Sequence, residues 1–151
     1  TDKVWSHFSV TEFNNVDNSP IVANLGNSSD NSPIIYSAVS DARKYRLFIR
    51  DDADTSVLLE SGALSLNTPY LNHATTNGAA QAQFVNSSAA GTGSTNTGAM
   101  TFNRFTLGAL GRAATTSFLN GSISEFIIYN TDQSANRPAI EANINNQYDI
   151  Y

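Results

Sequence analysis

Residues 119–151, LNGSISEFIIYNTDQSANRPAIEANINNQYDIY, combine a strand pattern and a helix pattern in one segment. The run GSISEFIIYN (121–130) is rich in β-branched and aromatic residues, which is typical of a strand. Farther on, apolar side chains recur every four residues in one narrow stripe: Ile140, Ile144 and Tyr148. Pro138 is expected in or near the first helical turn, because deeper in a helix it would remove a backbone hydrogen bond. The chain is therefore predicted to close on one strand and one short helix.

The rest of the chain is predicted to form short antiparallel strands, about nine in all, at the spacing of a sandwich or barrel. In KYRLFIR (44–50) apolar and basic residues alternate, and an acidic tip separates this run from VLLES (57–61). This pattern predicts a hairpin with one apolar and one basic face. A second hairpin is predicted within 70–86, because Asn77-Gly78 tolerates the positive φ angles of a tight turn. The fold class is therefore predicted to be all-β, an antiparallel β-sandwich with one short C-terminal helix.

Three further expectations concern packing. The stretch SSAAGTGSTNTGA (87–99) has no large side chain to bury, so a mobile loop is expected there. The apolar stripe of the helix needs an apolar support, and the exposed edge or mouth of the sandwich is the expected one. The last strand, 121–130, is expected at the centre of one sheet.

Composition and charge exclude several classes of protein. The chain has 151 residues, enough for a single domain over 1–151, and it carries a net charge of −5 with a pI near 4.7. Its 8 basic residues are too few for a stripe that tracks a phosphate backbone, so no nucleic-acid partner is expected. The absence of cysteine excludes disulfides, and no apolar run is long enough for membrane insertion. Because the first residue is Thr1 and not Met, the segment is expected to be a processed product or the C-terminal part of a longer chain.

The closing part of the chain, FNRFTLGALGRAATTSFLNGSISEFIIYNTDQSANRPAIEANI (102–144), resembles the end of concanavalin A-like lectin/glucanase domains of the laminin G type. The shared pattern begins with an apolar strand that ends in Gly, followed by a variable loop. An aromatic residue then precedes a Gly that opens the next strand, which has the form Gly-x-Ile-x-Glu and ends on Ile-Tyr-Asn. A short helix follows. The matching positions are Leu107, Gly108, Phe118 to Gly121, Ile123, Glu125, Phe126, Ile128, Tyr129 and Asn130. Domains of this family usually begin with an extra strand before the segment that starts here. The resemblance implies a concanavalin A-like jelly roll.

The sequence FIIYNTDQSANRPAIEANI (126–144) also resembles the ends of bacteriophage virion and tail-fibre-like proteins. This resemblance implies an adhesion module that is displayed in several copies, on a virion surface or outside a cell, and that binds a cell-surface glycan. The alternative is a purely structural virion, capsid-decorating or fibre protein that acts through contacts with neighbouring virion or fibre subunits. Exposed aromatic rings beside amides in a concave loop region would favour the first reading, and a flat apolar patch the second.

Catalysis is not expected from the acidic residues and histidines. None of the four Glu residues has a carboxylate partner at the spacing of retaining glycosidases: Glu12, Glu60, Glu125 and Glu141. His7 and His73 stand alone in strands, and each is expected to be a histidine with a satisfied hydrogen bond. The protein is therefore predicted not to be an enzyme.

If a glycan binds, aromatic rings would stack on the sugar and amides would contact its hydroxyl groups. The loops around 87–99 and 109–120 are the expected location, because the scaffold places variable loops at its ends. The candidate residues are Arg112, Asn120, Asn103, Tyr70 and Asn72.

The acidic tip DDAD (51–54) has two interpretations. Asp51, Asp52 and Asp54 could supply the oxygen ligands that calcium prefers. Alternatively, Asp is present there because it favours turn geometry and solubility. The turn interpretation is favoured, and no cofactor other than this candidate calcium is expected.

Overall fold

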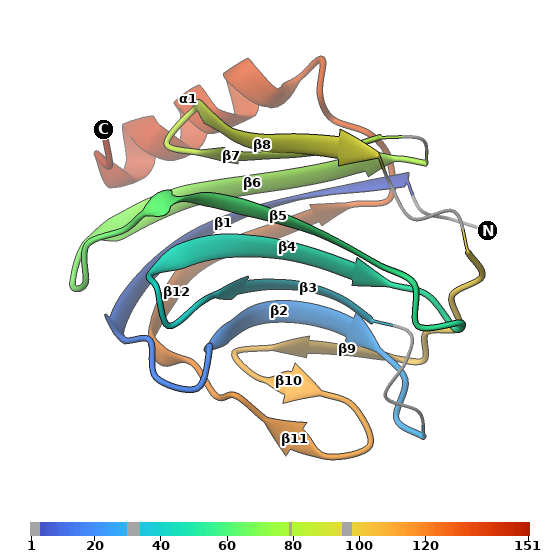
Figure 1. The fold of residues 1–151 in the computed structure, drawn as a ribbon. Coiled ribbons are helices and arrows are strands. Elements are labelled where there is room, and N and C mark those ends of the chain that lie inside the picture. The colour runs from blue at the N-terminus through green and yellow to red at the C-terminus, as the bar shows by residue number, and fades with distance from the viewer. Residues whose placement is uncertain (1–3, 30–33, 79, 95–97) are drawn as a thin grey trace.

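The computed structural model describes residues 4–29, 34–78, 80–94 and 98–151, which form two five-stranded antiparallel sheets packed as a sandwich (Figure 1). Sheet A has the strand order β12–β1–β6–β7–β8, and sheet B has the order β5–β4–β3–β2–β9. The strands of sheet A are β1 (Val4–Asn15), β6 (Pro69–Asn77), β7 (Ala80–Val85), β8 (Ser88–Ser94) and β12 (Asn120–Tyr129). Those of sheet B are β2 (Ile21–Gly26), β3 (Ile34–Val39), β4 (Lys44–Arg50), β5 (Ser56–Ala63) and β9 (Arg104–Leu107). A short hairpin, β10 (Leu110–Gly111) and β11 (Thr115–Thr116), and one helix, α1 (Arg137–Tyr148), complete the fold.

The predicted fold class is confirmed, and so are both predicted hairpins. Strands β4 and β5 pair antiparallel, and β6 pairs with β7 across a turn in which Gly78 has a φ of +87°. The period of two in β4 buries Tyr45, Leu47 and Ile49 between the sheets, at 0–1% exposure. Alternation of apolar and basic residues is sufficient to orient this strand, because one of its faces meets the core and the other meets water.

The expectation of a mobile loop at 87–99 is wrong for residues 88–94, which form β8 at the edge of sheet A. Residues 95–97 lie outside the described residues. The small side chains are compatible with order because the backbone pairs with β7 and comes close to sheet B. A Cβ atom added at Gly91 or Gly93 would lie 3.5 Å or 3.3 Å from the nearest atom of Leu59 on β5. The distance at Gly91 is an ordinary van der Waals contact, whereas the distance at Gly93 is tight, so β8 packs closely on β5 at Gly93 and a larger residue there would require Leu59 to shift.

The closing strand and helix are confirmed, but their positions differ from the expectation. Strand β12 lies at the edge of sheet A and not at its centre. Helix α1 has Pro138 in its first turn and covers the outer face of sheet A rather than the edge or mouth of the sandwich (Figure 1). Its apolar stripe meets a patch that β1 and β6 supply: Phe8, Val10 and Leu71 pack with Ile144, Ile140 and Tyr148. No helix of the described residues is long and apolar enough to cross a membrane.

The interior of the sandwich is unusually polar on the side of sheet A. Asn72 donates hydrogen bonds to His7 at 3.3 Å and to the Ser37 hydroxyl at 3.2 Å, and accepts one from Gln83 at 3.1 Å. All four side chains are buried, so this network links β6 and β7 of sheet A to β3 of sheet B. Apolar clusters flank it on both sides, one around Tyr45 and one around Leu47. Hydrogen bonding compensates part of the cost of burying these polar groups.

Candidate functional site

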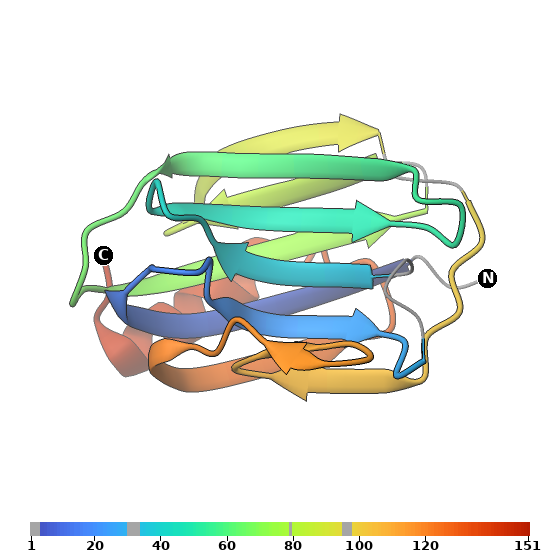
Figure 2. The ribbon, with the colours of Figure 1, turned by 60° about the horizontal axis from the view of Figure 1, so that its bottom comes forward.

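The broad surface left open by the fold is the outer face of sheet B. Figure 2 shows β5, β4 and β3 with no helix in front of them, while α1 lies on the far side behind sheet A. The sheet curves, and its outer face lies on the inside of the curve (Figure 1). Because Tyr45, Leu47 and Ile49 point into the core, the alternate residues of β4 point outward: Lys44, Arg46, Phe48 and Arg50. We call this surface, with Leu58 and Glu60 from β5 and the side chains of Arg104 and Arg112, the sheet B face.

Glu60 is the carboxylate at the centre of an ion-pair cluster on this face. It pairs across the strands with Arg46, whose Nε donates to Glu60 Oε1 at 2.6 Å, and Lys44 Nζ lies 3.8 Å from Oε2. The hydrogen bond from Arg46, followed by the charges of Arg46 and Lys44, holds the pKa of Glu60 below its usual range. Each partner is 31–40% exposed, so the cluster is available to solvent and contributes little to stability.

The β10–β11 hairpin walls one side of the sheet B face, over β2 and β9 (Figure 2). The buried side chain of Asn24 fixes it with two hydrogen bonds, accepting from Gly111 N at 2.8 Å and donating to Gly111 O at 3.1 Å. Arg104 Nη1 donates to the carbonyl oxygen of Arg112 at 2.7 Å. A Cβ atom at Gly26 would lie only 2.8 Å from Gly111 O, so this close approach of hairpin and sheet needs a glycine. Leu110 packs on Ile21, Ala38 and Phe48, and this apolar contact anchors the hairpin to sheet B.

Positive charge is concentrated on the sheet B face. It carries five of the chain's 8 basic residues, namely Lys44, Arg46, Arg50, Arg104 and Arg112, although the net charge of the protein is −5. The Phe48 ring and the 45% exposed Leu58 lie opposite each other in the strand register beside these cations. Guanidinium groups next to apolar side chains suit a ligand that has both a carboxylate and a CH-rich face. Arg46, Glu60 and Phe48 are not among the site residues predicted from the sequence. The basic face predicted for the hairpin at 44–61 is the sequence feature that could have indicated them.

The five residues predicted for a glycan site are dispersed. Arg112 lies on the sheet B face, with its Cγ 3.8 Å from the Cβ position of Gly26. Asn103 is exposed before β9 and accepts a hydrogen bond from Ser28 N at 2.8 Å. Asn120 is exposed at the start of β12, in a different depression of the surface. The structure therefore does not gather these residues into one site.

Tyr70 and Asn72 have structural surroundings. Tyr70 packs against the core cluster of Tyr45, and its hydroxyl accepts a hydrogen bond from Ser65 N at 2.8 Å. Asn72 is 0% exposed and bonded within the interior, which corrects its assignment as a reader of sugar hydroxyls. The two faces of a strand alternate, and sequence alone placed its amide on the wrong one.

The three carboxylates of the DDAD tip point to separate partners. Asp51 is 4% exposed, and its Oδ1 accepts from Ala53 N at 2.9 Å and Thr55 N at 2.8 Å. Asp52 accepts from Thr101 N and Oγ1, each at 3.1 Å, and Asp54 lies 3.5 Å from Arg50 Nε. The part of the chain that the structure describes holds no cluster of three or more potential metal ligands. The tip thus has the geometry of the turn interpretation, and the residues do not fit a calcium site.

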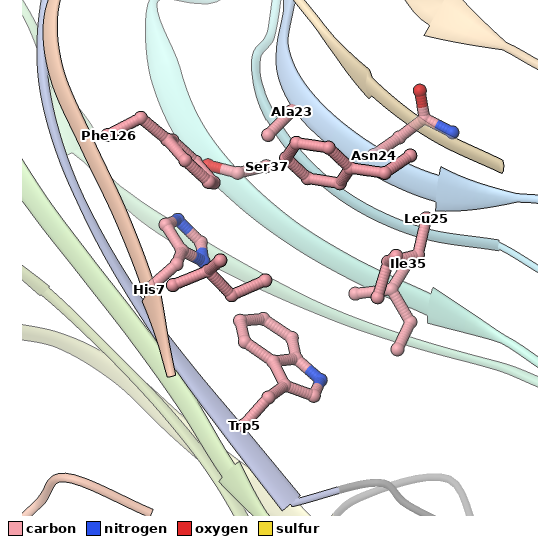
Figure 3. Close-up of a pocket in the computed structure, with 10 residues that line it drawn as sticks. Trp5, His7, Ala23, Asn24, Leu25, Ile35, Ser37 and Phe126 are labelled. Carbon is pink, nitrogen blue, oxygen red and sulfur yellow. The ribbon is translucent and has the colours of Figure 1, made fainter. Parts of the chain in front are cut away.

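A small cavity lies between the sheets near the flank formed by β9 and β12. Figure 3 shows Trp5, His7 and Phe126 of sheet A facing residues of sheet B across it. Its volume of about 20 Å³ holds one water molecule and no sugar. Burial lowers the pKa of His7 to about 4, so this imidazole is neutral near pH 7.

The second histidine differs from its expected environment. His73 lies under α1, stacked between Phe8 at 4.2 Å and Phe84 at 5.6 Å. Its ring nitrogens have no hydrogen-bond partner among the described residues, although a satisfied histidine was expected. Burial, followed by the charges of His7 and Arg137, lowers the pKa of His73 to about 3. Both histidines are therefore neutral packing elements and lie away from the sheet B face.

No protein-family model and no curated protein matches the sequence. Among solved structures, the chain is similar to the CBM40 carbohydrate-binding module of Ruminococcus gnavus IT-sialidase bound to α2,6 sialyllactose, with 12% identity, a TM-score of 0.79, and coverage of 92% of this chain and 82% of that chain. It is also similar to a mutant of NanB sialidase from Streptococcus pneumoniae, with 16% identity and a TM-score of 0.78 over 92% of this chain and 24% of that chain. A third similar structure is the native heptameric SAP-like pentraxin from Limulus polyphemus, with 12% identity and a TM-score of 0.67 over 89% of this chain and 67% of that chain. At these identities the likeness is one of fold, and the chain has a concanavalin A-like jelly-roll fold.

Proposed function

We propose that this protein is a non-catalytic carbohydrate-binding module that takes an acidic sugar on the sheet B face. The observation that carries the proposal is the row of outward basic side chains on β4, beside Phe48 and Glu60, in a protein of net charge −5. Arg46 and Lys44 would bind the sugar carboxylate, Glu60 would accept from sugar hydroxyls, and Phe48 would pack on the ring. The β10–β11 hairpin would limit the orientation of the ligand.

Similar structures supply the first probes for this proposal. Two of them are the CBM40 module of Ruminococcus gnavus IT-sialidase bound to α2,6 and to α2,3 sialyllactose. Both sugars carry a carboxylate on their terminal residue. Neutral lactose lacks the whole terminal residue and tests whether that residue is recognised. The methyl ester of each sialyllactose keeps the residue with its hydroxyl groups and removes only the negative charge, so it is the matched control for the carboxylate.

The test is a glycan array probed with the multimerised protein, with α2,3 sialyllactose, α2,6 sialyllactose, their methyl esters and lactose compared on one surface. Wild-type protein should prefer the acidic sugars, and Arg46→Met should weaken that signal about tenfold or more, because charge-assisted hydrogen bonds are lost. Arg43→Gln, at an exposed position in the turn before β4, is the control and should bind as wild type. Binding should be the same with calcium and with a chelator. A wild-type protein that ignores the carboxylate would refute the proposal.

A second proposal, contact between copies of this chain, is favoured by a separate observation. β12 is an edge strand of sheet A and β9 is an edge strand of sheet B, and the two lie on the same flank of the sandwich. On this flank three large apolar side chains are 46–47% exposed: Phe105, Leu107 and Ile128. Apolar side chains that gather on one flank are typical of protein contacts. We propose that a second copy packs there, as in a multivalent display on a virion, a fibre or a cell surface, where many weak glycan sites act together.

Sedimentation velocity over a range of protein concentrations tests this second proposal. Self-association is expected for the wild type, and it should disappear with Leu107→Asp, which places a charge on the flank. Ala142→Asp, at an exposed position of α1 on the outer face of sheet A, is the control for the added charge. Monomeric wild-type protein at the highest concentration would refute the contact.

A further inference from the structure

A depression of the surface, which we call the loop cleft, lies away from the sheet B face. It lies between the β1–β2 turn and the segment that leads into β12, two regions that run side by side at one end of the sandwich (Figures 1 and 2). Its volume is about 960 Å³. Asn15 pairs with Asn120, and Ile21 N donates to Ser117 O at 3.1 Å, so these contacts connect the two walls. The sheet B face shares none of its lining residues.

One wall of the loop cleft presents an exposed aromatic ring. Phe118 is 67% exposed, the highest value among the exposed large apolar side chains of the described residues. The backbone on either side of it is fixed, because Ser117 O accepts from Ile21 N and Leu119 N donates to Gly108 O at 2.8 Å. The ring is thus held outward by an ordered segment rather than by a loose one. An aromatic face in this position is suited to stacking against a CH-rich surface.

Three amide groups that line the loop cleft together with the ring have unused hydrogen-bonding capacity. Asn14, Asn18 and Asn120 all line the loop cleft, and their side-chain amides bond to no described residue. Each amide offers two donors and one acceptor oxygen, which is the set that vicinal hydroxyl groups need. By contrast, a structural amide, such as that of Asn24, is bonded at both of its ends.

The turn wall of the loop cleft is preformed. Asp17 N donates to Asn15 Oδ1 and Asn15 Nδ2 donates to Asp17 Oδ2, both at 2.8 Å, and Ser19 N donates to Asp41 Oδ1 at 3.0 Å. These bonds hold Asn18 in the left-handed region at a φ of +62°. A ligand would therefore find its partners in place, and little ordering entropy would oppose binding.

The charge of the loop cleft differs from that of the sheet B face. No described Lys or Arg lines it, and its one ionisable group is the carboxylate of Asp17. An anionic ligand would be repelled there, whereas neutral hydroxyl groups would not.

We propose that the loop cleft is a second saccharide site, which binds neutral glycans by stacking on Phe118 and by hydrogen bonds to Asn14, Asn18 and Asn120. It extends the proposed function to a different place on the molecule and does not depend on acidic-sugar binding by the sheet B face. Two sites of opposite preference would let one domain engage an acidic terminus and a neutral stretch of a cell-surface glycan.

The experiment uses an array of neutral glycans, built from hexoses, N-acetylhexosamines and deoxyhexoses, printed beside the two sialyllactoses. The wild-type protein should bind a subset of neutral glycans. Phe118→Ala and Asn120→Ala should each weaken that signal about tenfold, which corresponds to the loss of one stacking or hydrogen-bonding contact. Arg46→Met should leave the neutral signal unchanged. Tyr151→Ala, which removes an exposed aromatic ring at the C-terminus, is the control and should bind as wild type.

Three results would overturn the loop cleft as a saccharide site. The first is a wild-type protein that binds no neutral glycan, whatever the sialyllactose signal. The second is neutral binding that survives in both Phe118→Ala and Asn120→Ala. The third is neutral binding that Arg46→Met abolishes, because both kinds of sugar would then share the sheet B face. Loss of the sialyllactose signal alone would refute only the acidic-sugar proposal.

Discussion

The outer faces of the two sheets differ in what covers them, although each belongs to a five-stranded antiparallel sheet of the same sandwich. On sheet A, Phe8, Val10 and Leu71 form an apolar patch that α1 covers. On sheet B, the corresponding surface carries alternating basic side chains and no helix. A single helix therefore buries one outer face, which stabilises the fold, and leaves the other open to solvent, where we propose that the ligand binds. Substitutions on the first should act on the free energy of unfolding, and substitutions on the second should act on affinity.

The largest effect is expected from Ile144→Asp. Ile144 is 2% exposed and packs on the apolar patch of sheet A, so the variant would bury a charge that has no partner. The free energy of unfolding should fall by about 3–5 kcal/mol, a loss comparable to that of a large core truncation. Urea unfolding followed by tryptophan fluorescence measures it. Asn143→Asp, on the exposed side of the same helical turn, should change stability little. An unchanged urea midpoint for Ile144→Asp would show that α1 does not dock.

The second effect is a dependence of stability on pH that comes from the buried histidines. Their folded-state pKa values, about 3 for His73 and about 4 for His7, lie below the unfolded value near 6.5. Between these limits the unfolded chain binds more protons, so stability is present above about pH 6.5 and is lost as the pH falls toward 4. Each histidine should contribute a slope of about 1.4 kcal/mol per pH unit.

Urea unfolding at pH 7 and pH 5 checks this slope, because the carboxylates titrate mainly below that interval. His73→Phe keeps an aromatic ring between Phe8 and Phe84 and removes the titrating group, so it should reduce the slope by about half. Equal stability of the wild type at both pH values would contradict the neutral burial of His7 and His73.

The third effect concerns the wall of the sheet B face. A Cβ atom at Gly111 would overlap Thr106 Oγ1, so Gly111→Ala should displace the β10–β11 hairpin. We expect a loss of about 1–3 kcal/mol in unfolding free energy, typical of overpacking, together with weaker sialyllactose binding. Ala113→Ser, at the exposed tip of the same hairpin, is the matched control. Full binding by a destabilised Gly111→Ala would mean that the hairpin does not shape the ligand site.

Elements whose pattern is local could be predicted from the sequence. The alternation of Tyr45, Leu47 and Ile49 oriented β4, and the four-residue recurrence of Ile140, Ile144 and Tyr148 identified α1 and the face by which it docks. In both cases a period in the sequence matches the period of the backbone. A local pattern, however, does not show which distant surface the apolar stripe of a helix packs against. The sequence therefore predicts that α1 packs on the edge or mouth of the sandwich, whereas it packs on the outer face of sheet A.

Features that depend on long-range pairing could not be predicted. Strand β8 is ordered by its bonds to β7 and by the fit of Gly91 and Gly93 against Leu59, and small side chains carry no periodic signal of this. Arg112 lies in the turn of the β10–β11 hairpin, within the expected loop 109–120, but only the packing of that hairpin over β2 and β9 brings it to the sheet B face. Residue type alone makes Asn72 a candidate reader of sugar hydroxyls, whereas in the structure its side chain belongs to a buried network.

The smallest effect on stability, and the sharpest test of the two faces, is expected from Glu60→Gln. The Arg46–Glu60 pair is 31% exposed, so its loss should change unfolding free energy by less than about 1 kcal/mol. Binding should respond differently. The amide oxygen that replaces the carboxylate can still accept from sugar hydroxyls, while Arg46 and Lys44 keep their charge and no longer pair with a carboxylate of the protein, so affinity for α2,3 and α2,6 sialyllactose should rise. Titration of both sugars at low and high salt measures this, because screening should reduce the gain. If Glu60→Gln lowered the urea midpoint as far as Ile144→Asp, the outer face of sheet B would be a stabilising surface like that of sheet A, and the division of roles would fail.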